Sequence, residues 1–207
     1  MSSNDISAII QQKKFRSPVV TPQALSWDGN QLWLSSRDLG SLHKIDSETW
    51  KVVGEIDPPG IVWAGVSLGD GEMCFTIGKG LNDDRYVYRY APDTGFNKLF
   101  ACPDFTGSYL SFDGEYLYFS QWYNGDVHQV EDSGKIRRTI NVSAEICGHT
   151  FVDGTLYLIR GRENKDVPGK PEEWRLARID PRDAARVEDV ATIPFASRSL
   201  TFDGEHF

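Results

Sequence analysis

Short runs of alternating apolar and polar residues, separated by turns, fill most of the chain. Residues 24–35 contain two such runs on either side of an Asp-Gly pair, and residues 109–120 repeat this order. Alternation with a period of two is typical of a strand that buries one face, and an Asp-Gly pair between two such runs predicts a tight hairpin. The pattern therefore predicts an all-β fold.

The Asp-Gly pair recurs at spacings of 42, 43, 40 and 50 residues, and periods in the low forties are those of β-propeller blades. Each unit continues with a third alternating run, such as residues 87–90, then a turn and a fourth run, such as residues 135–140. Four strands make one propeller blade. The five pairs are Asp28-Gly29, Asp70-Gly71, Asp113-Gly114, Asp153-Gly154 and Asp203-Gly204.

These repeats predict a five-bladed β-propeller of four-stranded blades in one domain, residues 13–207, after an N-terminal extension, residues 1–12. The fifth blade is expected to be incomplete at its C-terminal end, lacking about one and a half strands. Residues 13–19 are expected to close that blade as its outer strand, since closure removes exposed sheet edges. The alternatives are a natural stop with a ragged fifth blade, or a blade completed by a second subunit. The blades are expected to start near Ala24, Gly65, Tyr109, His149 and Ser199.

The fourth spacing is the longest, and its extra residues fall at 160–174, between the predicted second and third strands. Insertions in propellers lie in loops on one face, often the binding face. This loop is expected either to contact a protein partner or to form a solvated hairpin.

The first repeat resembles the first blade of the glutamine-cyclotransferase-like propellers, through TPQALSWDGNQLW at residues 21–33 and KIDSET at residues 44–49. The general blade pattern is also similar to the NHL, streptogramin lyase and SMP-30/gluconolactonase group. This resemblance covers the whole chain at the level of blades and implies a propeller with its site at the channel. In the cyclases, a glutamate that opens the second blade is taken as the acid/base, whereas the matching stretch here is Trp63-Ala64-Gly65. A divergent cyclotransferase would need another carboxylate, such as Asp104.

The SMP-30 group uses acidic and amide side chains at the channel to hold a divalent cation. A hard cation needs several oxygen ligands, and the aligned positions here supply few. No metal or other cofactor is therefore predicted. The aligned positions are Gln23, Ala64 or Gly65, Ser108, Gly148 and Arg198.

In a propeller, side chains converge at the channel mouth from residues just before the inner strands and just after the second strands. Arginines at such positions predict a ligand with a carboxylate or phosphate, because a guanidinium binds these groups through two hydrogen bonds. The alternative is that they pair with surface carboxylates. Tryptophan and tyrosine side chains there predict an aromatic wall. The predicted ligand-binding residues are Gln23, Arg37, Trp63, Tyr109, Trp122, Arg160 and Arg198.

His149 is the only histidine at a predicted channel position, and it is the candidate general acid or base. The streptogramin lyases use a basic histidine near the channel, and His149 matches that role. The alternative is a structural hydrogen bond. If the protein is an enzyme, a metal-independent lyase or hydrolase centred on this residue is predicted.

The chain has 30 acidic and 22 basic residues, a net charge of −8, which argues against nucleic acid or an anionic membrane as its partner. No apolar run approaches the roughly 20 residues of a membrane span. The first residues lack the order of a secretory signal, so a cytoplasmic protein is expected. The leading prediction is a propeller that binds a small polar or anionic ligand at its channel mouth. The alternatives are a non-catalytic protein-interaction propeller and a divergent glutamine-cyclotransferase-like enzyme.

Overall fold

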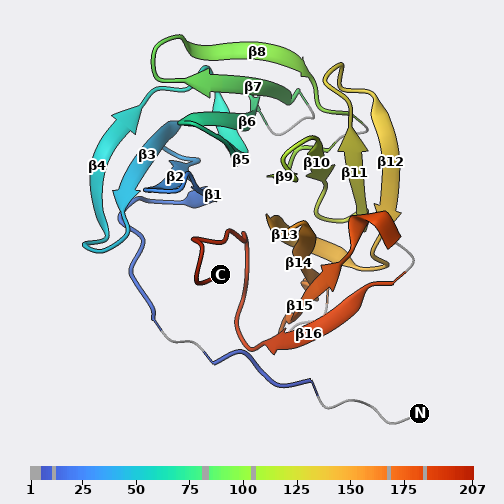
Figure 1. Ribbon diagram of the computed structural model, residues 1–207. Coiled ribbons are helices and arrows are strands. Elements are labelled where there is room, and N and C mark those ends of the chain that lie inside the picture. Colours follow the sequence, from blue (N-terminus) through green and yellow to red (C-terminus); the bar gives the residue numbers. More distant parts are fainter. Residues whose placement is uncertain (1–5, 11–12, 81–83, 104–105, 167–168, 184–185) are drawn as a thin grey trace.

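The computed structural model describes residues 6–10, 13–80, 84–103, 106–166, 169–183 and 186–207. In these ranges the strands form four antiparallel sheets of four strands, arranged as blades around a central channel (Figure 1). The all-β propeller is thus confirmed. The prediction of five blades is wrong, because the structure has four.

The blades follow one another in chain order, each from its inner to its outer strand. Blade 1 consists of β1 (Pro22–Trp27), β2 (Leu32–Ser36), β3 (Ser41–Asp46) and β4 (Lys51–Ile56). Blade 2 consists of β5 (Ile61–Gly69), β6 (Glu72–Gly78), β7 (Tyr86–Ala91) and β8 (Gly95–Ala101). Blade 3 consists of β9 (Tyr109–Phe112), β10 (Leu117–Ser120), β11 (Asp126–Val130) and β12 (Ile136–Asn141). Blade 4 consists of β13 (Glu145–Val152), β14 (Thr155–Arg162), β15 (Glu173–Ile179) and β16 (Glu188–Ile193).

Aromatic side chains fill the spaces between neighbouring blades. Trp33 of β2 packs against Phe75 of β6 and Tyr90 of β7, with ring centroids 5.8 and 5.6 Å away. Between blades 3 and 4, the rings of Tyr118 and Phe151 lie 4.8 Å apart. Buried aromatic area of this kind contributes much of the stability of a β-fold. The core therefore lies between the blades.

The Asp-Gly turns that join the first two strands of each blade are of two kinds. In blades 1 and 3, the aspartate carboxylate accepts the backbone N–H groups two and three residues later. In blades 2 and 4, both turn residues have positive φ, 52° and 81° at Asp70-Gly71 and 49° and 74° at Asp153-Gly154. Positive φ at both central residues defines the type I′ hairpin that Asp-Gly favours.

The fifth Asp-Gly pair forms its turn without a blade. Asp203 accepts the backbone N–H groups of Glu205 and His206, as the aspartates of blades 1 and 3 do. Residues 194–207 nevertheless contain no strand. They enter the ring between β1 and β13 (Figure 1). The Asp-Gly period therefore counts inner turns rather than complete sheets, which is why it overestimates the number of blades.

The predicted closure of the last blade by residues 13–19 is also wrong, because these residues form no strand. Pro18 has no N–H group to give to a sheet. Instead, Phe15 stacks on Trp50 of blade 1 at 4.8 Å. The N-terminal contact with blade 4 comes earlier in the chain, where the Ile9 N–H donates to Thr192 O of β16. The N-terminal segment thus passes along the outside of the gap between blades 4 and 1 (Figure 1).

Among the described residues, no helix is long and apolar enough to cross a membrane.

Candidate ligand site at the channel mouth

The channel mouth is the end of the ring at which the inner strands begin and the second strands finish. At this end, Trp63 of β5 carries the Arg85 guanidinium over its ring, 4.1 Å from the centroid. Arg85 Nη1 donates to Ser108 Oγ at 2.9 Å and to Gln121 Oε1 at 3.2 Å. Ser108 Oγ also donates to Gln121 Oε1. This cluster joins blades 2 and 3 through a buried cation, an aromatic face and two short polar side chains.

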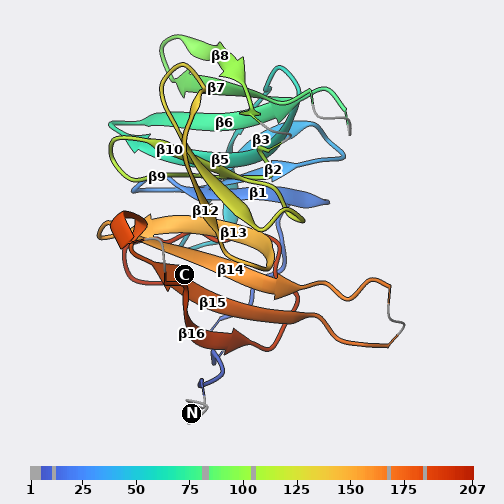
Figure 2. The same ribbon diagram turned by 90° about the vertical axis from the view of Figure 1, so that its right-hand side faces the viewer.

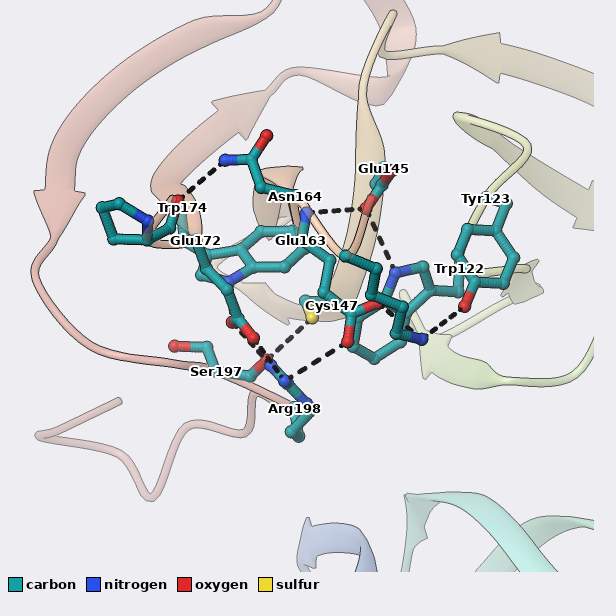
Figure 3. A network of polar contacts seen from close by, with 12 residues as sticks. Trp122, Tyr123, Glu145, Cys147, Glu163, Asn164, Glu172, Trp174, Ser197 and Arg198 are labelled. Atoms are coloured by element: carbon teal, nitrogen blue, oxygen red, sulfur yellow. Dashed lines mark hydrogen bonds and ion pairs between the residues drawn. The ribbon is translucent and has the colours of Figure 1, made fainter. Parts of the chain in front are cut away.

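A second aromatic–cation pair lies at the junction of blades 3 and 4 (Figure 3). The Arg198 guanidinium lies 5.1 Å from the Trp122 ring centroid, and it donates two hydrogen bonds to Glu172, at 2.8 and 2.5 Å. These bonds hold the pKa of the Glu172 carboxyl below its usual value. Trp122 Nε1 donates to Glu145 Oε2 at 3.3 Å. The indole is thus fixed at its edge by one carboxylate and covered on its ring by a guanidinium.

Two further charged groups complete this cluster. Lys165 Nζ lies 2.7 Å from Glu163, and Glu163 Oε1 lies 3.5 Å from Arg198. Lys165 also donates to the hydroxyl of Tyr123, and the Glu163 contact and this hydroxyl bond raise the pKa of the lysine. Three carboxylates, those of Glu145, Glu163 and Glu172, therefore face two cations here.

Tyr109, the first residue of β9, lies between the two aromatic–cation pairs. Its ring centroid is 6.3 Å from Trp122, and its hydroxyl points toward Cys147 Sγ, 4.0 Å away. Burial raises the pKa of this phenol, so it stays protonated. With Trp63 and Leu200, Tyr109 lines a constriction of only about 10 Å³, room for about one water. This constriction closes the mouth on its inner side.

His149 lines this constriction from β13 and is buried there. It is 2% exposed, and its Nδ1 shares a hydrogen bond of 2.7 Å with Ser111 Oγ of β9. Its Nε2 has no hydrogen-bond partner in the described part of the chain. Burial lowers the pKa of the imidazole to about 3, so the ring is neutral near neutral pH.

The other predicted residues do not converge on this cluster. Arg160 is held by Asp189 at 2.7 Å and by the backbone oxygen of Val142 at 2.9 Å, so its guanidinium is engaged at the blade 3–4 junction. Arg37 is exposed and lies 3.9 Å from Asp38. Gln23 is partly buried in β1. Of the seven predicted binding residues, the structure brings together Trp63, Tyr109, Trp122 and Arg198.

Arg85 escapes the sequence prediction, because the predicted mouth positions lie only before first strands and after second strands. It directly precedes β7, the third strand of blade 2, which starts at the same end of the blade. Glu172 directly precedes β15 in the same way. A charged residue just before a third strand is the signal that could have found both.

The described residues contain no group of three or more His, Cys, Asp or Glu side chains placed to hold a metal ion. Asp104, the carboxylate named for a divergent cyclotransferase, lies outside the described residues. Ala64, which stands where the cyclases have their glutamate, is buried in β5.

Comparisons with known proteins place the chain by its fold. No protein-family model matches the sequence, and no curated protein matches it by sequence. Among solved structures, a nidogen/laminin complex contains a chain with a TM-score of 0.65 and 13% identity, covering 88% of this chain and 69% of that one. Glutaminyl cyclase from Myxococcus xanthus matches with a TM-score of 0.57 and 15% identity, covering 82% of this chain and 73% of the cyclase. At these identities, the chain is similar to both as a β-propeller.

Proposed function

We propose that this propeller binds a small polar ligand at the channel mouth. The observation that carries the proposal is the convergence of two aromatic–cation pairs, Trp63 with Arg85 and Trp122 with Arg198, on either side of Tyr109. Flat aromatic faces next to a few fixed polar groups are typical of small-molecule sites. Blades 2, 3 and 4 all contribute to this cluster, as expected of a site at a propeller axis.

The charges at the mouth support a ligand with both polar and apolar parts. Arg198 and Arg160 already pair with Glu172 and Asp189, so neither guanidinium is free to take a ligand carboxylate without breaking an ion pair. Near blade 2, Gln121 and Ser108 offer an amide and a hydroxyl beside the Arg85 cation. A polar group of the ligand is therefore expected to bind near Gln121 and Ser108, with its apolar part against Tyr109 and Trp122.

A lyase or hydrolase activity centred on His149 stays a prediction. A base works best when its pKa lies near the working pH, and burial holds this imidazole far below it. The imidazole is also almost fully buried, in the wall of a constriction with room for about one water. The surroundings of His149 therefore favour a binding role. Similarity to a glutaminyl cyclase at 15% identity supports the fold, and Ala64 supplies no acid for cyclisation.

The proposal can be tested by thermal-shift screening, because a ligand that binds only the native state raises its melting temperature. The screen contains small carboxylates, phosphates, lactones and a dipeptide with N-terminal glutamine, each with and without divalent metal. Gln121→Ala removes an amide side chain at the mouth, including the Nε2 donor that a ligand oxygen could use. Its matched control is Gln129→Ala, which removes an amide that donates to Tyr118 away from the mouth.

We expect a metal-independent shift with a carboxylate or lactone that Gln121→Ala weakens and Gln129→Ala leaves unchanged. A compound that raises the melting temperature of both variants as much as that of the unmodified protein would bind elsewhere. Failure of every compound class would contradict the proposal.

The second candidate is a protein-interaction propeller, favoured by the long β14–β15 hairpin. Figure 2 shows this hairpin projecting away from the rest of blade 4. It carries the insertion at residues 160–174, and a projecting loop on a rigid scaffold suits partner recognition. Replacing residues 163–172 by a two-residue Asn-Gly turn would remove a partner's contact, measurable as loss of that partner in a pull-down.

A further inference from the structure

An open groove lies at the junction of blades 3 and 4, at the same end of the ring as the channel mouth. It has a volume of about 460 Å³, which is within the range typical of small-ligand sites. Three segments line it: residues 123–125 between β10 and β11, residues 143–145 leading into β13, and residues 161–162 at the end of β14. Both blades therefore contribute to a groove large enough for a small molecule.

Hydrogen bonds hold the lining segments together. The Val142 N–H donates to Gly125 O at 2.8 Å, and the Ile146 N–H donates to Trp122 O at 2.9 Å. Arg160 ties β14 to the same connection, because its Nη1 donates to Val142 O at 2.9 Å. The groove thus keeps its shape without a ligand, which lowers the entropic cost of binding.

Arg162 brings an unpaired guanidinium to this groove. Among the described residues, it has no hydrogen-bond or ion-pair partner. Its cross-strand neighbour in β15, Glu173, pairs with Lys170 instead, at 3.1 Å. Arg160, on the same face of β14, is already paired with Asp189. A guanidinium binds an anionic group such as a carboxylate through two parallel hydrogen bonds, so the groove is equipped to take one.

Two further side chains of the groove offer hydrogen-bond acceptors. Glu145 Oε2 accepts the Trp122 indole N–H and the Glu163 backbone N–H (Figure 3), whereas its Oε1 has no partner in the described part of the chain. Ser143 Oγ donates to Asn141 Oδ1 at 2.9 Å, so it is left to accept. These acceptors require hydroxyl or amine donors on the ligand. The charge of Glu145 also favours a singly charged carboxylate over a doubly charged phosphate as the anionic group.

Tyr123 gives the ligand a flat surface to pack on. This residue is 60% exposed, and its hydroxyl accepts a hydrogen bond from Lys165 Nζ at 3.0 Å, which holds the ring in place. A sugar ring has C–H groups on its face and hydroxyls around its edge. One face of such a ring can therefore pack on the tyrosine while its hydroxyls donate to Glu145 and Ser143.

We propose that this groove binds an acidic sugar, with the carboxylate on Arg162, hydroxyls on Glu145 and Ser143, and one face of the sugar ring on Tyr123. The inference goes beyond the proposed function, since the aromatic–cation pairs at the mouth consist of other residues. The two sites can therefore be tested separately.

Glucuronate is the direct probe, glucose lacks the carboxylate, and acetate lacks the sugar ring. Binding to the full chain is measured by calorimetry at neutral pH. We expect glucuronate to bind roughly tenfold more tightly than glucose, a ratio that corresponds to about 1.4 kcal/mol for the carboxylate–guanidinium pair, and also more tightly than acetate. Glucose or acetate binding as tightly as glucuronate, or no glucuronate binding at millimolar concentration, would overturn the proposal.

Variants locate the site. Arg162→Gln should remove the preference for glucuronate over glucose, and Tyr123→Ala should weaken the binding of both sugars. The matched control is Arg186→Gln, because Arg186 is also exposed and also has no partner among the described residues. A preference that survives Arg162→Gln, or that Arg186→Gln reduces equally, would contradict the assignment. Gln121→Ala at the mouth should leave glucuronate binding intact, so that failure of one site is distinguishable from failure of the other.

NMR of the unmodified protein gives a test that depends on no variant. Glucuronate should shift the side-chain Nε–H resonance of Arg162 and the backbone amide resonances of Asn124 and Ser143, all of which line the groove. The resonances of Arg186 should stay unchanged. Shifts confined to residues outside the groove would overturn the proposal.

Discussion

Asp28 Oδ2 accepts a hydrogen bond from Trp33 Nε1 at 2.6 Å, five residues further along the chain. The same carboxylate, through Oδ1, accepts two backbone N–H groups of its turn. Blade 3 repeats the arrangement, where Asp113 Oδ2 accepts the hydroxyl of Tyr118 at 2.9 Å. Because Trp33 and Tyr118 both fill spaces between blades, this aspartate fixes the hairpin turn and the inter-blade core together.

Asp28→Ala is therefore expected to destabilise the protein by about 1–3 kcal/mol, since it leaves the nearly buried Trp33 indole N–H without its acceptor. Chemical denaturation measures the change. Asp70→Asn is the control, because Asp70 lies in a type I′ turn whose positive φ asparagine tolerates. Equal losses in both variants would show that the carboxylate–indole bond has no special role.

The C-terminal segment packs directly against the backbone of Gly148. The φ of this glycine is +142°, and a Cβ there would lie 2.6 Å from Leu200 N and 2.9 Å from the carbonyl carbon of Ser199. Gly148→Ala should cost about 1–3 kcal/mol, through backbone strain and displacement of residues 199–200. Gly54→Ala is the control, because a Cβ there meets only the Lys44 side chain at 3.6 Å. A melting temperature unchanged by Gly148→Ala would mean that the segment does not pack on this glycine.

Displacement of the same segment has a chemical readout. Cys147 Sγ donates to Ser197 O at 2.8 Å, and burial raises the pKa of this thiol to about 12. Thiolate is the reactive form, so Cys147 should react slowly with iodoacetamide in the native protein at pH 8. Gly148→Ala should accelerate labelling of Cys147 but not of Cys74, which is buried within blade 2. Mass spectrometry of the labelled peptides distinguishes the two, and fast labelling of Cys147 in the unmodified protein would contradict this packing.

The propeller could be predicted because its turns and its alternation are local. Each Asp-Gly turn depends on neighbouring residues, and even the pair at Asp203 forms its turn. The number of blades depends on which strands find partners, and this is not a local property. The placement of residues 13–19 was not predictable for the same reason, because it depends on a residue far along the chain. Trp50 holds this segment by stacking on Phe15 and by a hydrogen bond from its Nε1 to Arg16 O.

His149 predicts a specific dependence of stability on pH. The pKa of an unfolded histidine is about 6.5, and in the folded protein burial lowers it to about 3. Below pH 6.5 the unfolded chain binds a proton that the folded chain refuses, so stability falls as the pH falls, by up to about 1.4 kcal/mol per pH unit, until about pH 3. His149→Leu should remove this contribution, seen as a shallower fall in unfolding free energy between pH 6 and pH 4. Parallel curves for the two proteins would contradict a buried neutral imidazole.

Glu172 predicts a second dependence, in a lower range of pH. Its pKa is depressed below the ordinary value of 4.5, chiefly by the hydrogen bonds from Arg198. The ion pair therefore stabilises the folded protein at pH values above the ordinary pKa of 4.5. Its contribution is lost as the pH falls through the depressed pKa of the folded state. Glu172→Gln should lower the melting temperature at pH 7 and converge with the unmodified protein in acid. Glu188→Gln, which breaks an exposed pair with Arg178, should have little effect at any pH.

The aromatic half of the candidate site was predictable, and the charged half was not. Trp63, Tyr109 and Trp122 occupy positions that the blade repeat assigns to the mouth, so the register of the strands suffices to place them. The arginines depend on which carboxylates they meet across blades. Arg198 is neutralised by Glu172, 26 residues earlier, and Arg160 by Asp189, 29 residues later. The position of an arginine in the sequence does not indicate which carboxylate it will pair with in the folded protein.

Hydrogen exchange in the presence of the best compound from the ligand screen tests the central claim most directly. A ligand at the channel mouth should slow exchange of the amides of Trp63, Tyr109 and Trp122, whose side chains form the aromatic part of the site. The amides of β4, an outer strand that contributes no residue to the site, should be unaffected. Protection confined to β4, or absent from the mouth, would contradict the account.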